Sequence, residues 1–94
     1  MKVVWTANAA NHLRAIHAYL AQNSPSYALQ TVDRLTRGSE YVGEFPMVGR
    51  VVPEIGRQQV RELILESYRL MYHVRPNKVE VLAVLHGARD FKVK

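Results

Sequence analysis

The last third of the chain alternates apolar and polar residues, which is the period of a strand with one buried face. Three such runs cover residues 60–65, 68–75 and 79–86. The breaks between them, Glu66-Ser67 and Pro76-Asn77, are too short for the crossover that a parallel connection needs. The pattern therefore predicts an antiparallel, three-stranded meander.

Two amphipathic helices are predicted before the meander, over about residues 7–22 and 25–42. Their apolar stripes follow helical spacing and consist of Ala9, Leu13, Ile16 and Leu20, then Ala28, Val32, Leu35 and Val42. Thr6 and Ser24 suit N-cap positions, and Pro25 suits the first turn of a helix. The short link between the two segments predicts an antiparallel helical hairpin.

A short apolar strand, Lys2–Trp5, opens the chain, and we expect it to join the sheet. Residues 43–57 are rich in glycine and proline, which predicts a loop, and their apolar side chains predict that it packs on the protein. The order β-α-α-β-β-β predicts an α+β fold, with the helical hairpin packed on a mostly antiparallel twisted sheet. With 94 residues, we expect a single domain spanning 1–94.

Composition narrows the function. There is no apolar run of ~18 residues and no secretory leader, so we expect a cytoplasmic protein without a membrane partner. Cysteine is absent and the four histidines are far apart, so we expect no metal site and no cofactor. The net charge of +5, mostly from arginine, favours an acidic protein segment or nucleic acid as partner. Solubility alone is the other explanation of this charge.

Strict alternation in the meander would place several cations and imidazoles on one face of the sheet. They are Arg69, His73 and Arg75, with His86 and Arg89 at the end of the neighbouring strand. Such a set could bind phosphate and cleave RNA without metal, because that reaction needs an acid, a base and cations. The alternative is that Arg69 and Arg75 pair with Glu62 or Glu80 across strands, and the residue pattern alone favours this alternative.

Short motifs run along nearly the whole chain. They are W-T-x-x-A-x-x-H-L-x-x-I-x-x-Y-L from Trp5, S-P-x-x-A from Ser24, F-P-x-x-G-R-x-x-P-E from Phe45, R-E-L from Arg61, Y-R-L-M-Y from Tyr68 and V-L-H-G-A-R from Val84. This set, in this order, resembles the ParE/RelE superfamily of bacterial type II toxins. The resemblance implies a helical hairpin against an antiparallel sheet. It also implies a cognate antitoxin whose flexible, often acidic segment wraps the toxin, and operator DNA that is reached only through that antitoxin.

The superfamily has two activities. RelE-like members cut mRNA in the ribosomal A site without metal, and ParE-like members inhibit DNA gyrase by binding. The G-R-x-x-P-E loop and the H-G-A-R ending are similar to the ParE side; residues 43–57 hold no lysine, and Phe91 cannot transfer a proton. The resemblance thus favours a ParE-like gyrase inhibitor that causes growth arrest and serves plasmid or genome maintenance. A ribosome-dependent endoribonuclease is the alternative, and a non-toxic antitoxin-binding co-repressor is the third hypothesis.

The resemblance also suggests roles for particular residues. In a nuclease, Arg61 and Arg69 would bind phosphate and His86 would be the acid/base. In a gyrase inhibitor, the target-binding residues would be Arg89, Lys92 and Lys94. The expected antitoxin-binding residues are Leu13, Ile16, Leu20, Val32, Leu35, Arg69 and Arg75.

Overall fold

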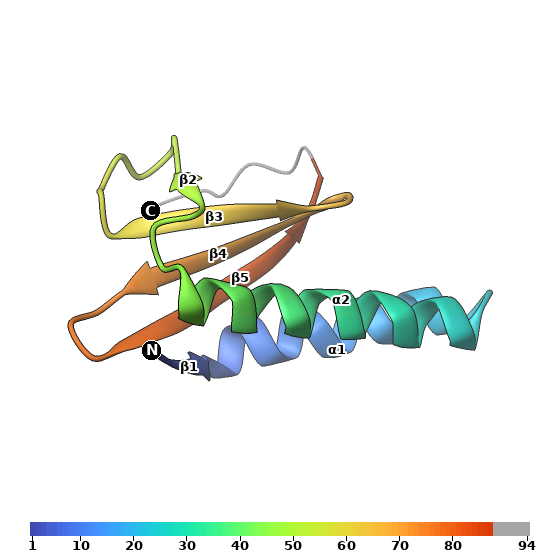
Figure 1. The fold of residues 1–94 in the computed structure, drawn as a ribbon. Coiled ribbons are helices and arrows are strands. Elements are labelled where there is room, and N and C mark those ends of the chain that lie inside the picture. The colour runs from blue at the N-terminus through green and yellow to red at the C-terminus, as the bar shows by residue number, and fades with distance from the viewer. Residues whose placement is uncertain (88–94) are drawn as a thin grey trace.

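The computed structural model describes residues 1–87, and these form two helices and a five-stranded sheet (Figure 1). The elements are β1 (Lys2–Trp5), α1 (Ala7–Ala21), α2 (Pro25–Glu44), β2 (Arg50–Val51), β3 (Val60–Leu65), β4 (Tyr68–Val74) and β5 (Lys78–His86). The predicted helices and the four predicted strands are present, and their ends differ by no more than two residues from those expected. The two-residue strand β2 was not predicted, because its glycine- and proline-rich surroundings show no strand pattern.

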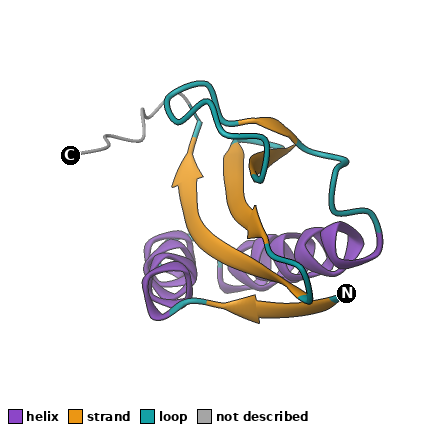
Figure 2. Ribbon diagram, turned by 90° about the vertical axis from the view of Figure 1, so that its left-hand side faces the viewer, coloured by secondary structure: helices purple, strands orange, loops and turns teal. Residues whose placement is uncertain are grey.

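The strands lie in the order β1-β5-β4-β3-β2. The predicted meander is confirmed, since β3, β4 and β5 pair antiparallel. β1 joins the sheet as expected and pairs parallel with the first half of β5, from Lys2 against Lys78 to Trp5 against Val81. A parallel pair needs a long crossover, which the helical hairpin supplies. Figure 2 shows that β1 leads into α1, and that the longer β5 continues beyond the end of β1 and curves away.

Both helices begin where their caps predict. The Thr6 hydroxyl accepts the N–H of Ala9 at 3.1 Å, and the Ser24 hydroxyl accepts the N–H of Tyr27 at 3.2 Å. Neither helix of the described chain has the length and apolar character needed to cross a bilayer.

The second helix runs past its predicted end at residue 42, because α2 continues through Gly43 to Glu44. The carbonyl of Gly43 accepts a hydrogen bond from the Met1 amine at 2.8 Å. A Cβ at this glycine would lie 2.6 Å from Val3 Cγ2. Gly43 therefore lets the start of the chain pack tightly on α2 rather than breaking the helix.

The main core lies between the helices and one face of the sheet. It contains Leu35 and Val42 from α2 together with Leu70, Tyr72 and Val81 from the strands. The loop after α2 crosses to the other side of β3, as Figure 1 shows. There it forms a second apolar cluster, composed of Val52, Val60, Met71 and Ala83 with Ile55 beside them. This confirms the prediction that the loop packs on the protein. We call the face that carries this second cluster the far face of the sheet.

A β-bulge interrupts the alternation of β5. Tyr72 pairs with Val81 but Met71 pairs with Ala83, so Leu82 is an extra residue without a partner on β4. The extra residue reverses the faces of all the positions that follow it. The prediction that His86 lies on the same face as Glu80 is therefore wrong, and His86 lies on the helix side.

Candidate functional site

Arg69 lies on the far face in a buried ion cluster. Its guanidinium donates to Glu62 Oε1 at 2.7 Å and to both carboxylate oxygens of Glu54 at 2.8 and 2.9 Å. The other oxygen of Glu62 accepts from Arg50 Nε at 2.6 Å. The Arg69 side chain is only 8% exposed and that of Glu62 is fully buried. The hydrogen bonds that Arg69 donates to Glu54, and after them its hydrogen bond to Glu62, raise the pKa of Arg69 above its usual range.

The ion cluster explains three of the sequence motifs together. F-P-x-x-G-R-x-x-P-E supplies Arg50 and Glu54, R-E-L supplies Glu62, and Y-R-L-M-Y supplies Arg69. Two arginines face two glutamates, so the formal charges balance. The expected cross-strand pairing of Arg69 with Glu62 is confirmed, although the pair is buried rather than solvated. The placement of Arg69 as an exposed phosphate-binding cation is wrong, because its guanidinium fastens the loop to the sheet.

Arg61 lies on the helix side at the start of β3, where it binds backbone rather than carboxylates. Its guanidinium donates to the carbonyls of Gly49 at 2.8 Å and Gln58 at 2.9 Å. The hydroxyl of Tyr72 donates to the Pro46 carbonyl at 2.8 Å and accepts the Gly49 N–H at 2.9 Å. Burial raises the pKa of Tyr72. Arg61 and Tyr72 together hold the loop that follows α2.

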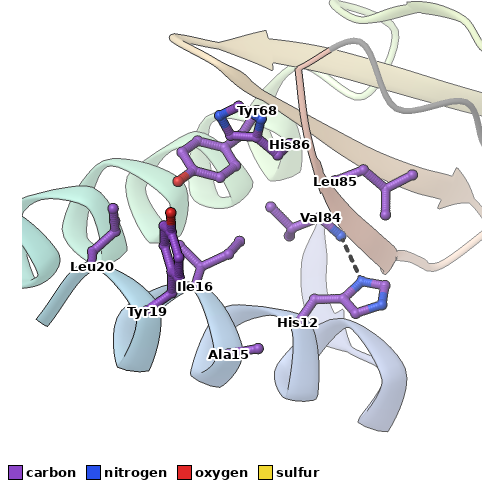
Figure 3. A pocket seen from close by; sticks show the side chains of 9 residues that line it. All are labelled: His12, Ala15, Ile16, Tyr19, Leu20, Tyr68, Val84, Leu85 and His86. Atoms are coloured by element: carbon purple, nitrogen blue, oxygen red, sulfur yellow. Dashed lines mark hydrogen bonds between the residues drawn. The ribbon is translucent and has the colours of Figure 1, made fainter. Parts of the chain in front are cut away.

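A groove of about 600 Å³ lies between α1 and the last part of β5 (Figure 3). Its lining consists of His12, Ala15, Ile16, Tyr19, Leu20, Tyr68, Val84, Leu85 and His86. β1 ends before this part of β5, and His12 Nδ1 accepts the Val84 N–H at 3.2 Å on the strand edge that β1 leaves uncovered. His86 packs at right angles to Tyr68, with ring centres 5.2 Å apart. Burial raises the pKa of Tyr68.

The structure does not bring together the three residues expected for a nuclease. Arg69 is on the far face, whereas Arg61 and His86 are on the helix side. Arg61 pairs with Tyr72 and His86 pairs with Tyr68, so roughly 13 Å of strand separates them at ~3.3 Å per residue. The bulge in β5 causes this arrangement, because it moves His86 away from the face that Arg69 occupies.

The residues expected to bind an antitoxin are mostly turned toward the protein's own sheet. Leu35 is 1% exposed and belongs to the core, so its placement on a binding surface is wrong. Leu13 and Ile16 pack against that core, and Leu20 and Val32 are half-buried. An apolar stripe marks the face that packs inside the fold, which is why it did not identify an outer surface.

Four large side chains on the helices are exposed, and the sequence pattern did not indicate them. They are Tyr19, Tyr27, Leu29 and Tyr41, with Tyr19 70% exposed at the mouth of the groove. The signal that could have found them is their position away from the apolar stripes, since a large apolar side chain there has no core to enter.

The remaining expected residues are cationic. Arg75 Nε donates to Glu80 Oε1 at 2.6 Å, which confirms the expected cross-strand pair. Arg89, Lys92 and Lys94 lie outside the described residues. Within residues 1–87, no three histidine or carboxylate side chains gather as ligands of a metal ion would.

Comparison with known proteins identifies the family. The family described as the ParE toxin of the type II toxin-antitoxin system parDE matches residues 3–91. The chain belongs to this ParE toxin family. The toxin is 32% identical over 88 residues to Toxin RelE2 of Caulobacter vibrioides, which covers 94% of this chain and 97% of the relative.

A solved structure supports the fold of this ParE-family toxin. A chain of the chromosomal ParDE toxin-antitoxin system from P. aeruginosa superposes with a TM-score of 0.76 at 24% identity, covering 93% of this chain and 96% of that one. The expected α+β fold and the expected superfamily are both confirmed. A toxin of a ParDE-type system implies a cognate antitoxin as partner.

Proposed function

We propose that this ParE-family toxin inhibits DNA gyrase by binding, in the cytoplasm and without chemistry of its own. The observation that carries the proposal is the neutralised Arg69, whose guanidinium is held by Glu54 and Glu62. A metal-free nuclease needs a cation free to hold phosphate, with an acid or base beside it. Arg69 has no such freedom, and His86 lies on the other side of the sheet.

A supercoiling assay tests this proposal. Purified toxin is added to gyrase and relaxed plasmid, with and without its antitoxin. We expect inhibition that the antitoxin reverses. An absence of inhibition at a large molar excess of folded toxin would overturn the proposal.

We propose that the residues in contact with gyrase are Arg89, Lys92 and Lys94, as the family resemblance suggests. Deleting the chain from Asp90 onward removes both lysines. We expect the truncated toxin to bind antitoxin normally and to inhibit gyrase less. Unchanged inhibition would assign the contact to another surface.

Ribosome-dependent mRNA cleavage is the second candidate, and the groove is the observation that favours it. It gathers two imidazoles and two phenols, from His12, His86, Tyr19 and Tyr68, which are groups able to move protons. In that case the chemistry belongs to the groove rather than to the far face. A His86→Ala toxin that folds and still cleaves mRNA on ribosomes would exclude His86 as the acid/base, and His17→Ala is the matched control.

We propose that the antitoxin docks in this same groove. Ile16 and Leu20 form an apolar wall there, and Tyr19 stands exposed beside them. Tyr19→Ala removes exposed surface only, and we expect it to weaken antitoxin binding at least tenfold, or by about 1.4 kcal/mol. Tyr41→Ala is the control, because Tyr41 is also exposed, at 48%, but lies near the end of α2 and does not line the groove. Equal effects of the two variants would contradict the assignment.

A further inference from the structure

Cationic side chains gather on the far face, at the end of the sheet where β1 and β5 begin. Lys2 and Lys78 are direct partners across strands. Their neighbours Val3 and Val79 pack in the main core, so both lysines point to the far face. His73 is on the same face, because the adjacent Tyr72 packs in that core.

Two arginines complete this group. Arg75 pairs with Glu80, which lies opposite His73 and also within 4.0 Å of Lys78. Arg57 is close enough to His73 to lower its pKa. We call the five residues the cationic patch, and its members are Lys2, Arg57, His73, Arg75 and Lys78.

The positive charge of the patch exceeds the negative charge of the carboxylate that is paired with it. The ion pairs that its members form within residues 1–87 all go to Glu80. Two lysines and two arginines against one carboxylate leave three positive charges, with His73 neutral. On α2, by contrast, Arg34 pairs with Glu66 and Arg37 with Asp33.

This concentration of charge has a cost for the folded state. Like charges directly opposite each other on neighbouring strands destabilise a sheet, as Lys2 and Lys78 do here. Burial, then the charges of Arg75 and Arg57, lower the pKa of His73, while Glu80 opposes them. An anion bound to the patch would relieve this repulsion.

We propose that the cationic patch binds the phosphate groups of a nucleic acid backbone. Lysine and arginine donors are sufficient for phosphate contacts, which carry no sequence information. An acidic peptide would in addition need apolar anchoring sites, and the patch has none among its members. Of the exposed large apolar side chains among residues 1–87, Met1 adjoins the patch in sequence, whereas the others lie on the helices, in the loop after α2 and at Ile64 of β3.

The size of the patch sets the number of contacts. It spans β1, β5 and β4, or about 10 Å at ~4.8 Å between strands. One strand of duplex DNA has a phosphate every ~3.4 Å along its axis, so about three phosphates fit. The contact is sequence-independent and separate from gyrase binding, and recognition of operator sequence stays with the antitoxin.

The test is fluorescence anisotropy of the full-length toxin with a labelled DNA duplex of arbitrary sequence, over a series of salt concentrations. Lys2→Gln with Lys78→Gln should reduce the slope of log affinity against log salt by about 2, since each contact contributes ~0.9. Arg14→Gln with Arg37→Gln removes the same charge from the exposed helices and should leave the slope unchanged. A single-stranded RNA arm shows which nucleic acid is preferred, and binding of either supports phosphate recognition.

Two results would overturn the proposal. Equal slope changes in the two double variants would mean that diffuse charge, not the patch, binds DNA. Binding to a polyglutamate peptide without binding to either nucleic acid would make the patch a protein-docking site. Neither readout depends on gyrase, so failure here is distinct from failure of the proposed inhibition. Thermal melting checks the fold, and we expect Lys78→Gln to melt no lower than the parent because it removes the repulsion from Lys2.

Discussion

Arg69 is held from two directions, by Glu62 across the strand pair and by Glu54 from the loop. A buried ion pair is strongly coupled, because removing one partner leaves a buried charge without compensation. The same side chain on an exposed strand would be a candidate for phosphate binding. Arg69 has a structural role here because of the two carboxylates that hold it, and not because it is an arginine.

We predict that Arg69→Met destabilises the toxin by roughly 3–5 kcal/mol, because Glu62 then stays buried without its partner. Urea denaturation measures the change. Arg37→Met is the matched control, since its pair with Asp33 is exposed and should contribute about 0–1 kcal/mol. Adding Glu62→Gln to Arg69→Met should recover part of the loss. Small and equal effects at both arginines would show that the cluster is solvated.

A second prediction at the residue scale concerns His73. Its pKa should lie below 6.5, because burial and the nearby Arg75 and Arg57 disfavour the imidazolium. Arg75→Gln removes one of these charges and frees Glu80, so it should raise the pKa of His73. NMR titration of the ring protons measures both values, and Arg14→Gln, on the helix side, should change nothing.

The free energy of unfolding should depend on pH through His73. Since the folded-state pKa of His73 is lowered, the unfolded chain takes up the proton first as the pH falls below 6.5. The contribution of His73 to stability is therefore complete above that pH and declines until the folded-state pKa is passed. A His73→Gln variant should lack this part of the pH dependence, and an unchanged profile would contradict the assignment.

Among the elements, the loop between α2 and β3 depends on a single glycine. A Cβ at Gly49 would lie 2.5 Å from the Glu62 carbonyl oxygen and 2.6 Å from the Tyr72 hydroxyl. Both atoms are held in place, one by the β-strand backbone and the other by its bond to Pro46. The glycine of the G-R-x-x-P-E motif is thus required by close packing between loop and sheet.

We predict that Gly49→Ala destabilises the toxin by about 1–3 kcal/mol through overpacking. It should also speed hydrogen exchange at the residue 49 amide, because the bond to the Tyr72 hydroxyl is lost. Gly56→Ala is the control: its φ of +69° strains an alanine, but no neighbouring atom lies within 4 Å of the added Cβ. That variant should keep the residue 49 amide protected. Equal protection in both variants would mean that the loop adapts.

At the scale of the whole molecule, the two sides of the sheet carry different surfaces. The groove lies on the helix side, and the cationic patch lies at one end of the far face. We predict that their functions are separable. Tyr19→Ala should weaken binding of the antitoxin and leave the affinity for duplex DNA unchanged. Lys2→Gln with Lys78→Gln should have the opposite effect, as calorimetry and anisotropy would measure. A variant that impairs both would mean that the surfaces overlap.

The sequence was sufficient to predict the order of the elements, the meander and the helical hairpin. These follow from the local period of apolar residues and from caps such as Thr6 and Ser24, which act within a few residues of chain. The sequence pattern also favoured cross-strand pairing of Arg69 and Arg75 with Glu62 or Glu80, and the pair of Arg75 with Glu80 is one of these. The sequence was not sufficient for β2, since two residues are too few to show a period.

The arrangement of residues at the candidate site depends on contacts between parts of the chain that are far apart in the sequence. β5 is apolar on both sides of Leu82, so its pattern could not reveal the extra residue that turns His86 toward the helices. Glu54 neutralises Arg69 only because the loop crosses to the far face. The helices and strands follow from the sequence, because local period and capping act over a few residues. Which charged groups are paired depends on residues that folding brings together from distant parts of the chain, so it follows from the fold and not from any local pattern.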